Sequence, residues 1–366
     1  MINQLKNKVK EDAVFIASFF LALLSCFISP PKIEYIDFKV LLSLFNLMVV
    51  VEAFKKLKIL EMISINILDR CNTERTVSLM LMLITFLFSM LVTNDVALIT
   101  FVPLSLIIAK KTKVDPAEIV IFQTLAANIG SSLTPMGNPQ NLFLYSKYNI
   151  KTAEFFKIMF PFAFSGFIFL ILFNWIIPNK KIIFHIEEVK IEDKKSALIF
   201  TGLFAVILLS IFNFISYLSA FIITLFVTFI FDKKLFKRVD YILLFTFVFF
   251  FIFIGNLSHF EYIKIVVSKI LDKPRSTFLA SITLSQFISN VPCAIFLSGF
   301  TTNYRELLLG VDIGGMGTLI ASLASVISYK IYTNEYKDQK RKYLIKFSLY
   351  NFSALILFTL AFLFFI

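Results

Sequence analysis

The stretch NIGSSLTPMGNPQN at residues 128–141 has a related copy in the second half of the chain, DIGGMGTLIASLAS at residues 312–325. An ungapped alignment carries the match on into the apolar sequence that follows each copy. The identical pairs are Ile129/Ile313, Gly130/Gly314, Thr134/Thr318, Tyr145/Tyr329 and Tyr148/Tyr332. Each copy is a small, polar, glycine-containing interruption of an apolar region, and glycine is a common helix breaker. The two copies therefore predict two related breaks in apolar helices.

The composition indicates a membrane protein. The 366-residue chain is 58% hydrophobic and 16% charged, with a mean hydropathy of +0.84, whereas soluble domains carry roughly a quarter charged residues. A soluble core has too little volume for this much apolar surface. We therefore predict an all-α polytopic membrane protein. The net charge of +12 lies in short clusters between apolar runs, which favours cytoplasmic loops over nucleic-acid binding.

The apolar runs predict the spans, because one crossing needs about 20 residues. The runs cover residues 13–29, 36–53, 76–109, 115–147, 155–177, 196–213, 216–231, 239–255, 276–300, 303–329 and 343–366. Two of them have polar centres, Thr93-Asn94-Asp95 and Ser289-Asn290-Val291-Pro292, which we interpret as the tips of re-entrant hairpins. Residues 196–231 would make about 54 Å of helix against a hydrocarbon core of about 30 Å. We therefore divide that region near residues 213–216.

The distribution of Lys and Arg predicts the orientation. With the N-terminus in the cytoplasm and each hairpin returning to its own side, the inside segments hold 26 of the 36 basic residues. These segments are residues 1–12, 54–76, 110–116, 178–196, 232–238 and 330–346. The prediction is a cell-membrane protein with nine crossings, two hairpins and an external C-terminus.

Further landmarks extend the repeat over most of the single transmembrane domain, residues 1–366. The landmark pairs are Asp37/Asp240, Asn94/Asn290 and Asn128/Asp312, at separations of 203, 196 and 184 residues. We assign repeat one to residues 13–177, a cytoplasmic linker plus connecting helix to residues 178–213, and repeat two to residues 214–366. The extra helix at residues 196–213 lies between the two copies, so repeat one enters the membrane from the inside and repeat two from the outside. We therefore predict two inverted-topology repeats, each with a re-entrant hairpin and a broken transmembrane helix.

These polar breaks carry the functional prediction. Irregular backbone at membrane depth is tolerated only where it is buried in protein or lines a wet cavity. Two breaks in corresponding half-chain positions are typical of the substrate site of a secondary transporter. A helix that begins at a hairpin tip points its free backbone N–H groups and positive dipole end at the site, which favours an anion. A helix that ends at a break presents free backbone carbonyls, which favour a cation such as sodium. The candidate substrate- and ion-binding residues are Thr93, Asn94, Asp95, Thr134, Gly137, Asn138, Asn141, Ser289, Asn290, Asp312, Thr318, Ser322 and Ser325.

Two of these candidates, Asp95 and Asp312, are acids. A carboxylate at membrane depth is costly and marks a functional site by default, so each could carry a proton or balance a cation. The alternative for Asp312 is a helix N-cap.

The motifs around Asn128–Asn141, Thr93–Asp95 and Ser289–Pro292 resemble those of the ion transporter superfamily. This group includes divalent anion:sodium symporters, citrate carriers, arsenite permeases and a sodium/proton antiporter branch. The resemblance spans about residues 36–332. It implies a homodimer whose transport domain undergoes an elevator-type motion. In the dicarboxylate symporters a Ser-Asn-Thr triplet at each tip binds carboxylate and helps to place sodium. Here Asp95 and Val291 replace the third Thr, which weakens the case for a dicarboxylate.

Several functions remain open from the sequence. The first is secondary transport of a small inorganic or organic anion, coupled to Na⁺ or H⁺. Sodium/proton antiport and arsenite or antimonite efflux are alternatives on the same scaffold. An enzyme is disfavoured because the chain has no HExxH, GxSxG or Walker motif, and a channel because it has no repeated filter sequence. We expect no catalytic residue, no cofactor, no metal beyond transient Na⁺, and no partners other than the small anion, membrane lipid and that second copy.

Overall fold

The computed structural model describes residues 13–69, 71–184 and 188–366, and these residues form helices and no β-sheet. The helices are α2 (Ala13–Ser25), α3 (Phe38–Lys56), α4 (Ile59–Leu68), α5 (Glu74–Val92), α6 (Asn94–Thr112), α7 (Ala117–Ser131), α8 (Pro139–Lys147), α9 (Thr152–Phe173), α10 (Lys194–Ile211), α11 (Tyr217–Asp232), α12 (Tyr241–Leu257), α13 (Glu261–Ile270), α14 (Pro274–Ile288), α15 (Asn290–Ser298), α16 (Tyr304–Gly314), α17 (Leu323–Glu335) and α18 (Lys340–Leu363). Short 3₁₀ turns are η1 (Ile33–Tyr35), η2 (Asn174–Ile176), η3 (Lys233–Lys237), η4 (Leu319–Ala321) and η5 (Lys337–Gln339). The predicted all-α polytopic class is confirmed. The predicted cytoplasmic segment 1–12 and part of the linker, residues 185–187, lie outside the described residues.

The breaks in the helices fall where the sequence predicts them. Hairpin α5–α6 turns at Thr93 and hairpin α14–α15 turns at Ser289. The long apolar region divides between α10 and α11, where Asn213 has a φ of 65°. Two helices were not predicted, α4 and α13, which lie in segments that we had assigned to loops.

Most predicted crossings are not single long helices. Among the described residues, four helical segments have the length and apolar composition of a membrane span, namely α5, Thr152–Ile176, α10 and Lys337–Leu363. The pair α11–η3 and α12, bent by 86°, could make a fifth. Three of the four lie in predicted crossings, whereas α5 is the first arm of a predicted hairpin. The helices in the other predicted crossings are broken or shorter than 18 residues, or, like α3, carry several charged residues. The number of crossings therefore stays a prediction.

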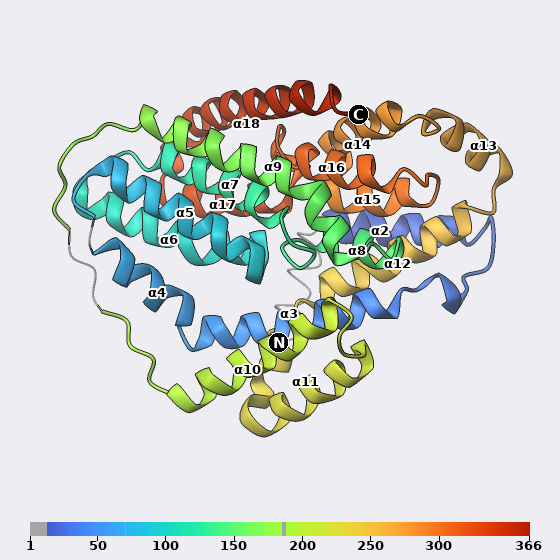
Figure 1. Cartoon of the computed structure of the whole chain (residues 1–366), viewed down its shortest axis with the longest axis horizontal. Coiled ribbons are helices and arrows are strands. Elements are labelled where there is room, and N and C mark those ends of the chain that lie inside the picture. The colour runs from blue at the N-terminus through green and yellow to red at the C-terminus, as the bar shows by residue number, and fades with distance from the viewer. Residues whose placement is uncertain (1–12, 70, 185–187) are drawn as a thin grey trace.

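The two broken helices run in opposite directions through the molecule. Figure 1 shows α5, α6 and α7 in the left half and α14, α15 and α16 in the right half. Each broken helix then crosses over, so that α8 lies on the right and α17 on the left. As a result α17 packs against α6 and α7, while α8 packs against α15 and α16. Both breaks are thereby brought to the middle of the fold.

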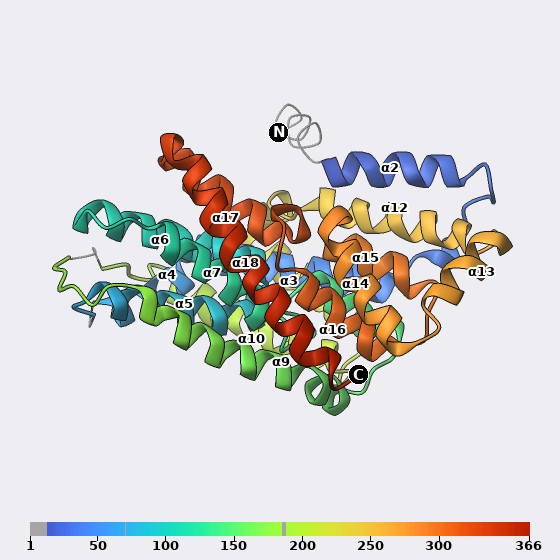
Figure 2. The same cartoon turned by 90° about the horizontal axis from the view of Figure 1, so that it is seen from above.

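The remaining helices surround this centre. Helix α2 packs along α12, and α10 and α11 pack on α3. Figure 2 shows α18 running across the face formed by α7 and α16. The first arm of each hairpin lies along the first half of the following broken helix, α5 on α7 and α14 on α16.

Candidate functional site

The two hairpin tips share an unusual backbone conformation. Thr93 has φ 82° and ψ 151°, and Ser289 has φ 73° and ψ 154°. This region is populated almost only by glycine, and a residue with a side chain held there costs about 1–3 kcal/mol. Such strain persists only when the surrounding structure fixes it, and it clusters at functional sites. The sequence predicted both tips, but not their conformation.

A matching pair of hydroxyl groups ties each helix break to its hairpin. Thr134 donates its hydroxyl hydrogen bond to the carbonyl of Met90. Thr318 donates to the carbonyl of Gln286 at 2.9 Å. Both carbonyls belong to the residue three positions before the tip. The two threonines, predicted as ligands, therefore use their hydroxyls in this state to hold the site together.

Close glycine contacts recur at equivalent positions as well. A Cβ on Gly130 would lie 2.3 Å from the Phe86 carbonyl oxygen and 2.6 Å from Ser89 Oγ. A Cβ on Gly314 would lie 2.9 Å from both side-chain atoms of Ser285. Ser89 and Ser285 each lie four residues before a tip. Glycine thus allows each broken helix to approach its hairpin.

The two helix breaks bind each other reciprocally. Asn128 and Asp312 lie in the last turns of α7 and α16. Asn128 Oδ1 accepts a hydrogen bond from Ser322 Oγ at 3.1 Å, and Asp312 Oδ1 accepts one from Asn138 Nδ2 at 3.0 Å. Asn138 and Ser322 are the N-cap residues of α8 and α17, and they are aligned in the repeat. Each first half-helix therefore contacts the start of the second half-helix in the other repeat.

The hairpin tips join the same group of residues. Asn94 Nδ2 donates to Asn128 Oδ1 at 3.4 Å, and Asn128 Nδ2 donates to the Gly315 carbonyl at 3.3 Å. Gly315 in turn lies against the second tip, since a Cβ there would be 2.9 Å from Asn290 Nδ2. We call this group the central polar cluster; its members are Asn94, Asn128, Asn138, Gln140, Asn290, Asp312, Gly315 and Ser322. The side chains are buried, with residue exposures of at most 4%. Of the two surroundings that tolerate such breaks, burial in protein is therefore the one that the structure shows.

Asp312 is the charged member of the cluster. Its Oδ1 also accepts a hydrogen bond from Gln140 Nε2 at 3.2 Å, whereas its Oδ2 is buried without a partner among the described residues. Asp312 lies in the last turn of α16 rather than at a helix N-terminus, so the N-cap interpretation does not hold. The negative end of a helix dipole disfavours a carboxylate. A proton or a cation at Oδ2 would offset the cost of burying this oxygen without a partner and the unfavourable interaction of the carboxylate with the helix dipole.

Two other predicted residues shape the first break. The Gly137 carbonyl accepts a hydrogen bond from the Asn94 backbone N–H at 3.0 Å. A Cβ on Gly137 would lie 2.1 Å from the Ser131 carbonyl oxygen, so only glycine fits. Asn141 donates its backbone N–H to Asn138 Oδ1 at 2.9 Å and its amide to the Ser132 carbonyl at 3.3 Å.

Asp95 is not joined to the cluster. It follows Asn94 on α6 and is half-buried, and its carboxylate has no hydrogen-bond or ion-pair partner in the described part of the chain. The charged groups that act on it electrostatically are those of Asp240 and Lys55. Ser325 is buried, and its hydroxyl has no partner within the same described ranges. The two predicted acids thus occupy different surroundings.

Four residues of the site were missed as candidates, Asn128, Gln140, Gly315 and Gln286. Asn128 could have been found, because it is aligned with Asp312. Gln140 belongs to the same polar motif as Asn138. Gln286 has no counterpart in the first half, where Met90 stands, yet its amide donates to the carbonyls of Gly314 and Met316 at 2.8 and 3.1 Å.

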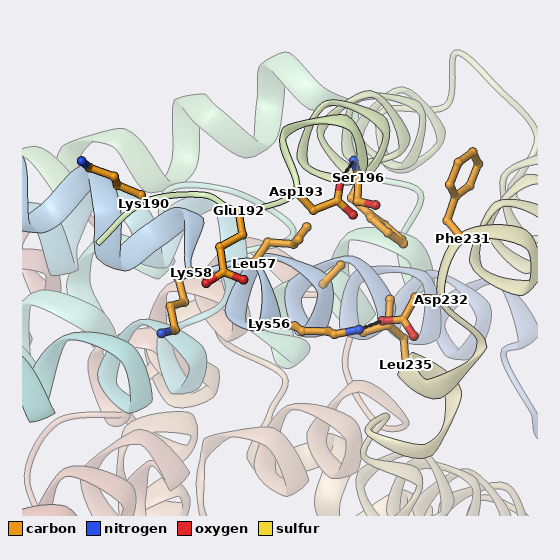
Figure 3. A pocket seen from close by; sticks show the side chains of 12 residues that line it. Lys56, Leu57, Lys58, Lys190, Glu192, Asp193, Ser196, Phe231, Asp232 and Leu235 are labelled. Atoms are coloured by element: carbon orange, nitrogen blue, oxygen red, sulfur yellow. Dashed lines mark hydrogen bonds and ion pairs between the residues drawn. The ribbon is translucent and has the colours of Figure 1, made fainter. Parts of the chain in front are cut away.

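A separate cavity of about 300 Å³ lies between the C-terminal ends of α3 and α11 and the N-terminal end of α10 (Figure 3). An ion pair of Lys56 with Asp232 crosses it, and Asp193 caps α10 beside it by accepting from the Ser196 N–H at 2.9 Å. None of its lining residues belongs to the central polar cluster. The cavity is therefore distinct from the candidate site.

Comparison with known proteins agrees with this architecture. The family model described as citrate transporter matches residues 5–303. An uncharacterised transporter of Methanocaldococcus jannaschii is 37% identical over 87% of this chain and 88% of its own length. The inner membrane protein YbiR of Escherichia coli is 30% identical over 81% of this chain and 80% of its own length. A putative transporter arsB of Dictyostelium discoideum is 27% identical over 36% of this chain and 23% of its own length. With a helical fold built around two interlocked helix breaks, the chain belongs to the citrate transporter family of membrane transporters.

Proposed function

We propose that this transporter is a secondary active carrier that moves a small inorganic or organic anion, coupled to Na⁺ or H⁺. The observation that carries the proposal is the meeting of both hairpin tips and both helix breaks in one buried polar cluster. Such a cluster at the crossing point of two broken helices is suited to bind a ligand and to change its exposure from one side to the other.

The anion half of the proposal rests on the helix N-termini. Helices α6 and α15 begin at the two tips, with Asn94 and Asn290 as their first residues. The N-terminal end of a helix carries partial positive charge and free N–H groups. Two such ends beside neutral amides favour an anion without a positive side chain. Asn94 and Asn290 would donate their amides to that anion.

The coupling half rests on Asp312. The C-terminal ends of α7 and α16 and the carboxylate of Asp312 together favour positive charge. The partnerless Oδ2 is where we place the proton or sodium ion. Loading this site neutralises the cluster before it rearranges, which lowers the cost of moving it through the membrane.

Uptake into vesicles tests the proposal. Purified protein in liposomes is given labelled citrate, succinate or sulfate, with an inward Na⁺ gradient, a pH gradient or neither. We expect gradient-dependent uptake of at least one of these anions, and its loss when the gradient is collapsed. Uptake that is the same without a gradient would rule out coupling.

The carboxylate also supports a second candidate, sodium/proton antiport, because the buried, partnerless Oδ2 of Asp312 suits cation exchange. In the same vesicles, electrogenic exchange of Na⁺ for H⁺ with no anion requirement would favour this function and refute the anion carrier. Arsenite and antimonite are tested separately, by comparing the resistance of a deletion strain with that of its parent.

A further inference from the structure

A long groove lies between α9, α16 and α18. Its volume is about 820 Å³. Ile168 and Leu172 of α9 and Leu357 of α18 form its exposed apolar walls, and Leu309 of α16 lies at its floor. Phe358 closes the base by contacting α9, with ring centroids 5.3 Å from Phe162 and Phe169. The groove is thus a defined channel between helices.

The groove has a charged end and an apolar remainder. Its lining follows α9 from Glu154 to Leu172, which is about 27 Å at 1.5 Å per residue. That length approaches the hydrocarbon thickness of a bilayer, about 30 Å. Its four charged lining residues, Glu154, Lys157, Arg305 and Glu306, all lie in the first two turns of α9 or α16. The groove is therefore charged at one end and apolar along the rest of its length, as a phospholipid is.

The charged side chains at this end are two bases and two acids, and one base already forms an ion pair with one acid. Arg305 pairs with Glu154 at 2.6 Å, and the Tyr304 hydroxyl donates to the same carboxylate at 2.7 Å. The side chains of Lys157 and Glu306 have no ion-pair or hydrogen-bond partner in residues 13–69, 71–184 and 188–366. One unpaired cation and one unpaired anion complement a zwitterionic headgroup.

We propose that this groove binds one membrane phospholipid whose headgroup carries both a phosphate and a primary amine. The phosphate lies at Lys157, the protonated amine lies at Glu306, and an acyl chain fills the channel between α9 and α18. Lys and carboxylate groups form charge-assisted hydrogen bonds with such partners.

The site has a structural consequence for the transport helix. Arg305, Leu309 and Asp312 are spaced by four and three residues, so they lie on one face of α16. A lipid in the groove would brace the helix that carries Asp312. Any effect of the lipid on transport rests on the proposed function; binding of the lipid does not.

Photolabelling tests the binding directly. The full-length protein is reconstituted with phosphatidylethanolamine that carries a photoreactive acyl chain, and the labelled residues are mapped by mass spectrometry. We expect labelling at residues 165–172 and 357–361 to exceed labelling at the outer face of α11, where Ile222, Phe226 and Phe229 are more exposed than the groove residues. Equal labelling of all these segments would show ordinary lipid contact and overturn the proposal.

Variants test the headgroup. Lys157→Ala and Glu306→Ala should each lower groove labelling by about two- to fivefold, the range for a partly exposed ion pair. Lys151→Ala, at the exposed start of the same helix, should leave it unchanged. Equal groove labelling by a phosphatidylglycerol probe, which has no amine, would refute recognition of the amine. Because labelling is read without transport, it stands or falls independently of the proposed function.

Discussion

Asn128 and Asp312 occupy the same position in two related segments, and they differ by one charge. Both accept a hydrogen bond from the N-cap residue of the opposite repeat. Asn128 satisfies its amide with the Gly315 carbonyl, whereas Asp312 keeps a buried oxygen without a partner among the described residues. The difference places a titratable or cation-binding group on one side of the cluster only.

The first prediction concerns Asp312. Asp312→Asn should leave the fold intact and remove the dependence of transport on the Na⁺ or pH gradient, because an amide neither binds a proton near neutral pH nor supplies a charge for sodium. The measurement is vesicle uptake as a function of Na⁺ concentration and pH. Asn128→Asp, which adds a charge at the aligned position, is the matched comparison. An unchanged Na⁺ and pH profile in Asp312→Asn would refute the coupling role.

The second prediction concerns the tip amides. Asn94→Ala and Asn290→Ala should each abolish transport, because each removes a donor next to the N-terminus of a half-helix. Membrane insertion and yield should match the wild type. Asn66→Ala, on the exposed face of α4, is the control and should transport normally. Normal uptake by both tip variants would remove these residues from the site.

Helix packing at the element scale depends on the close approach of each broken helix to its hairpin. Gly130 and Gly314 make that approach possible against Ser89 and Ser285. Thr134 and Thr318 then fasten the breaks to the same hairpins. Because these contacts surround the strained tips, they are what holds Thr93 and Ser289 in their unfavourable conformation.

The third prediction follows from this packing. Gly130→Ala should lower the stability by about 1–3 kcal/mol, the usual cost of overpacking, because its methyl group would meet the backbone oxygen of Phe86. Gly202→Ala is the matched control, since Gly202 lies inside α10 with nothing within 4 Å of an added Cβ. That change should gain about 0.5–1 kcal/mol from helix propensity. Thermal unfolding in detergent measures both, and equal melting temperatures would contradict the packing argument.

The charge pattern at the scale of the whole molecule predicts how the chain lies in the membrane. The predicted inside segments hold 26 of the 36 Lys and Arg residues, and such an excess marks the cytoplasmic side. The nine predicted crossings would then place the two termini on opposite sides of the membrane. The opposite directions of the two broken helices in Figure 1 are compatible with inverted repeats.

The fourth prediction tests this orientation. A fluorescent protein fused to the N-terminus should fluoresce, because it stays in the cytoplasm. Alkaline phosphatase fused to the C-terminus should be active, because it reaches the outside. Exchanging the two reporters is the control and should silence both. Activity of the same reporter at both ends would show an even number of crossings and disprove the predicted topology.

The sequence predicted the features that depend on local composition. Polar residues inside apolar runs located the tips at Thr93 and Ser289, and helix length located the break near Asn213. Helix α4 was not predicted, because its ten residues lie between basic residues and the segment was assigned to a loop. Helix α13 was not predicted, because it is short and amphipathic. The contact of Asn128 with Ser322 joins residues 194 positions apart, so it depends on the packing of whole helices and could not be derived from spacing.

The charge that distinguishes Asp312 from Asn128 also affects the relative free energies of the inward- and outward-facing forms when no ligand is bound. Two chemically identical halves could exchange conformations and yield inward- and outward-facing forms of equal free energy. The two halves of this chain differ at many positions, and Asp312 adds a charge to these differences, because the exchange moves its carboxylate into different surroundings. We therefore expect the unloaded carrier to prefer one side of the membrane, with the ionic conditions setting the size of the bias.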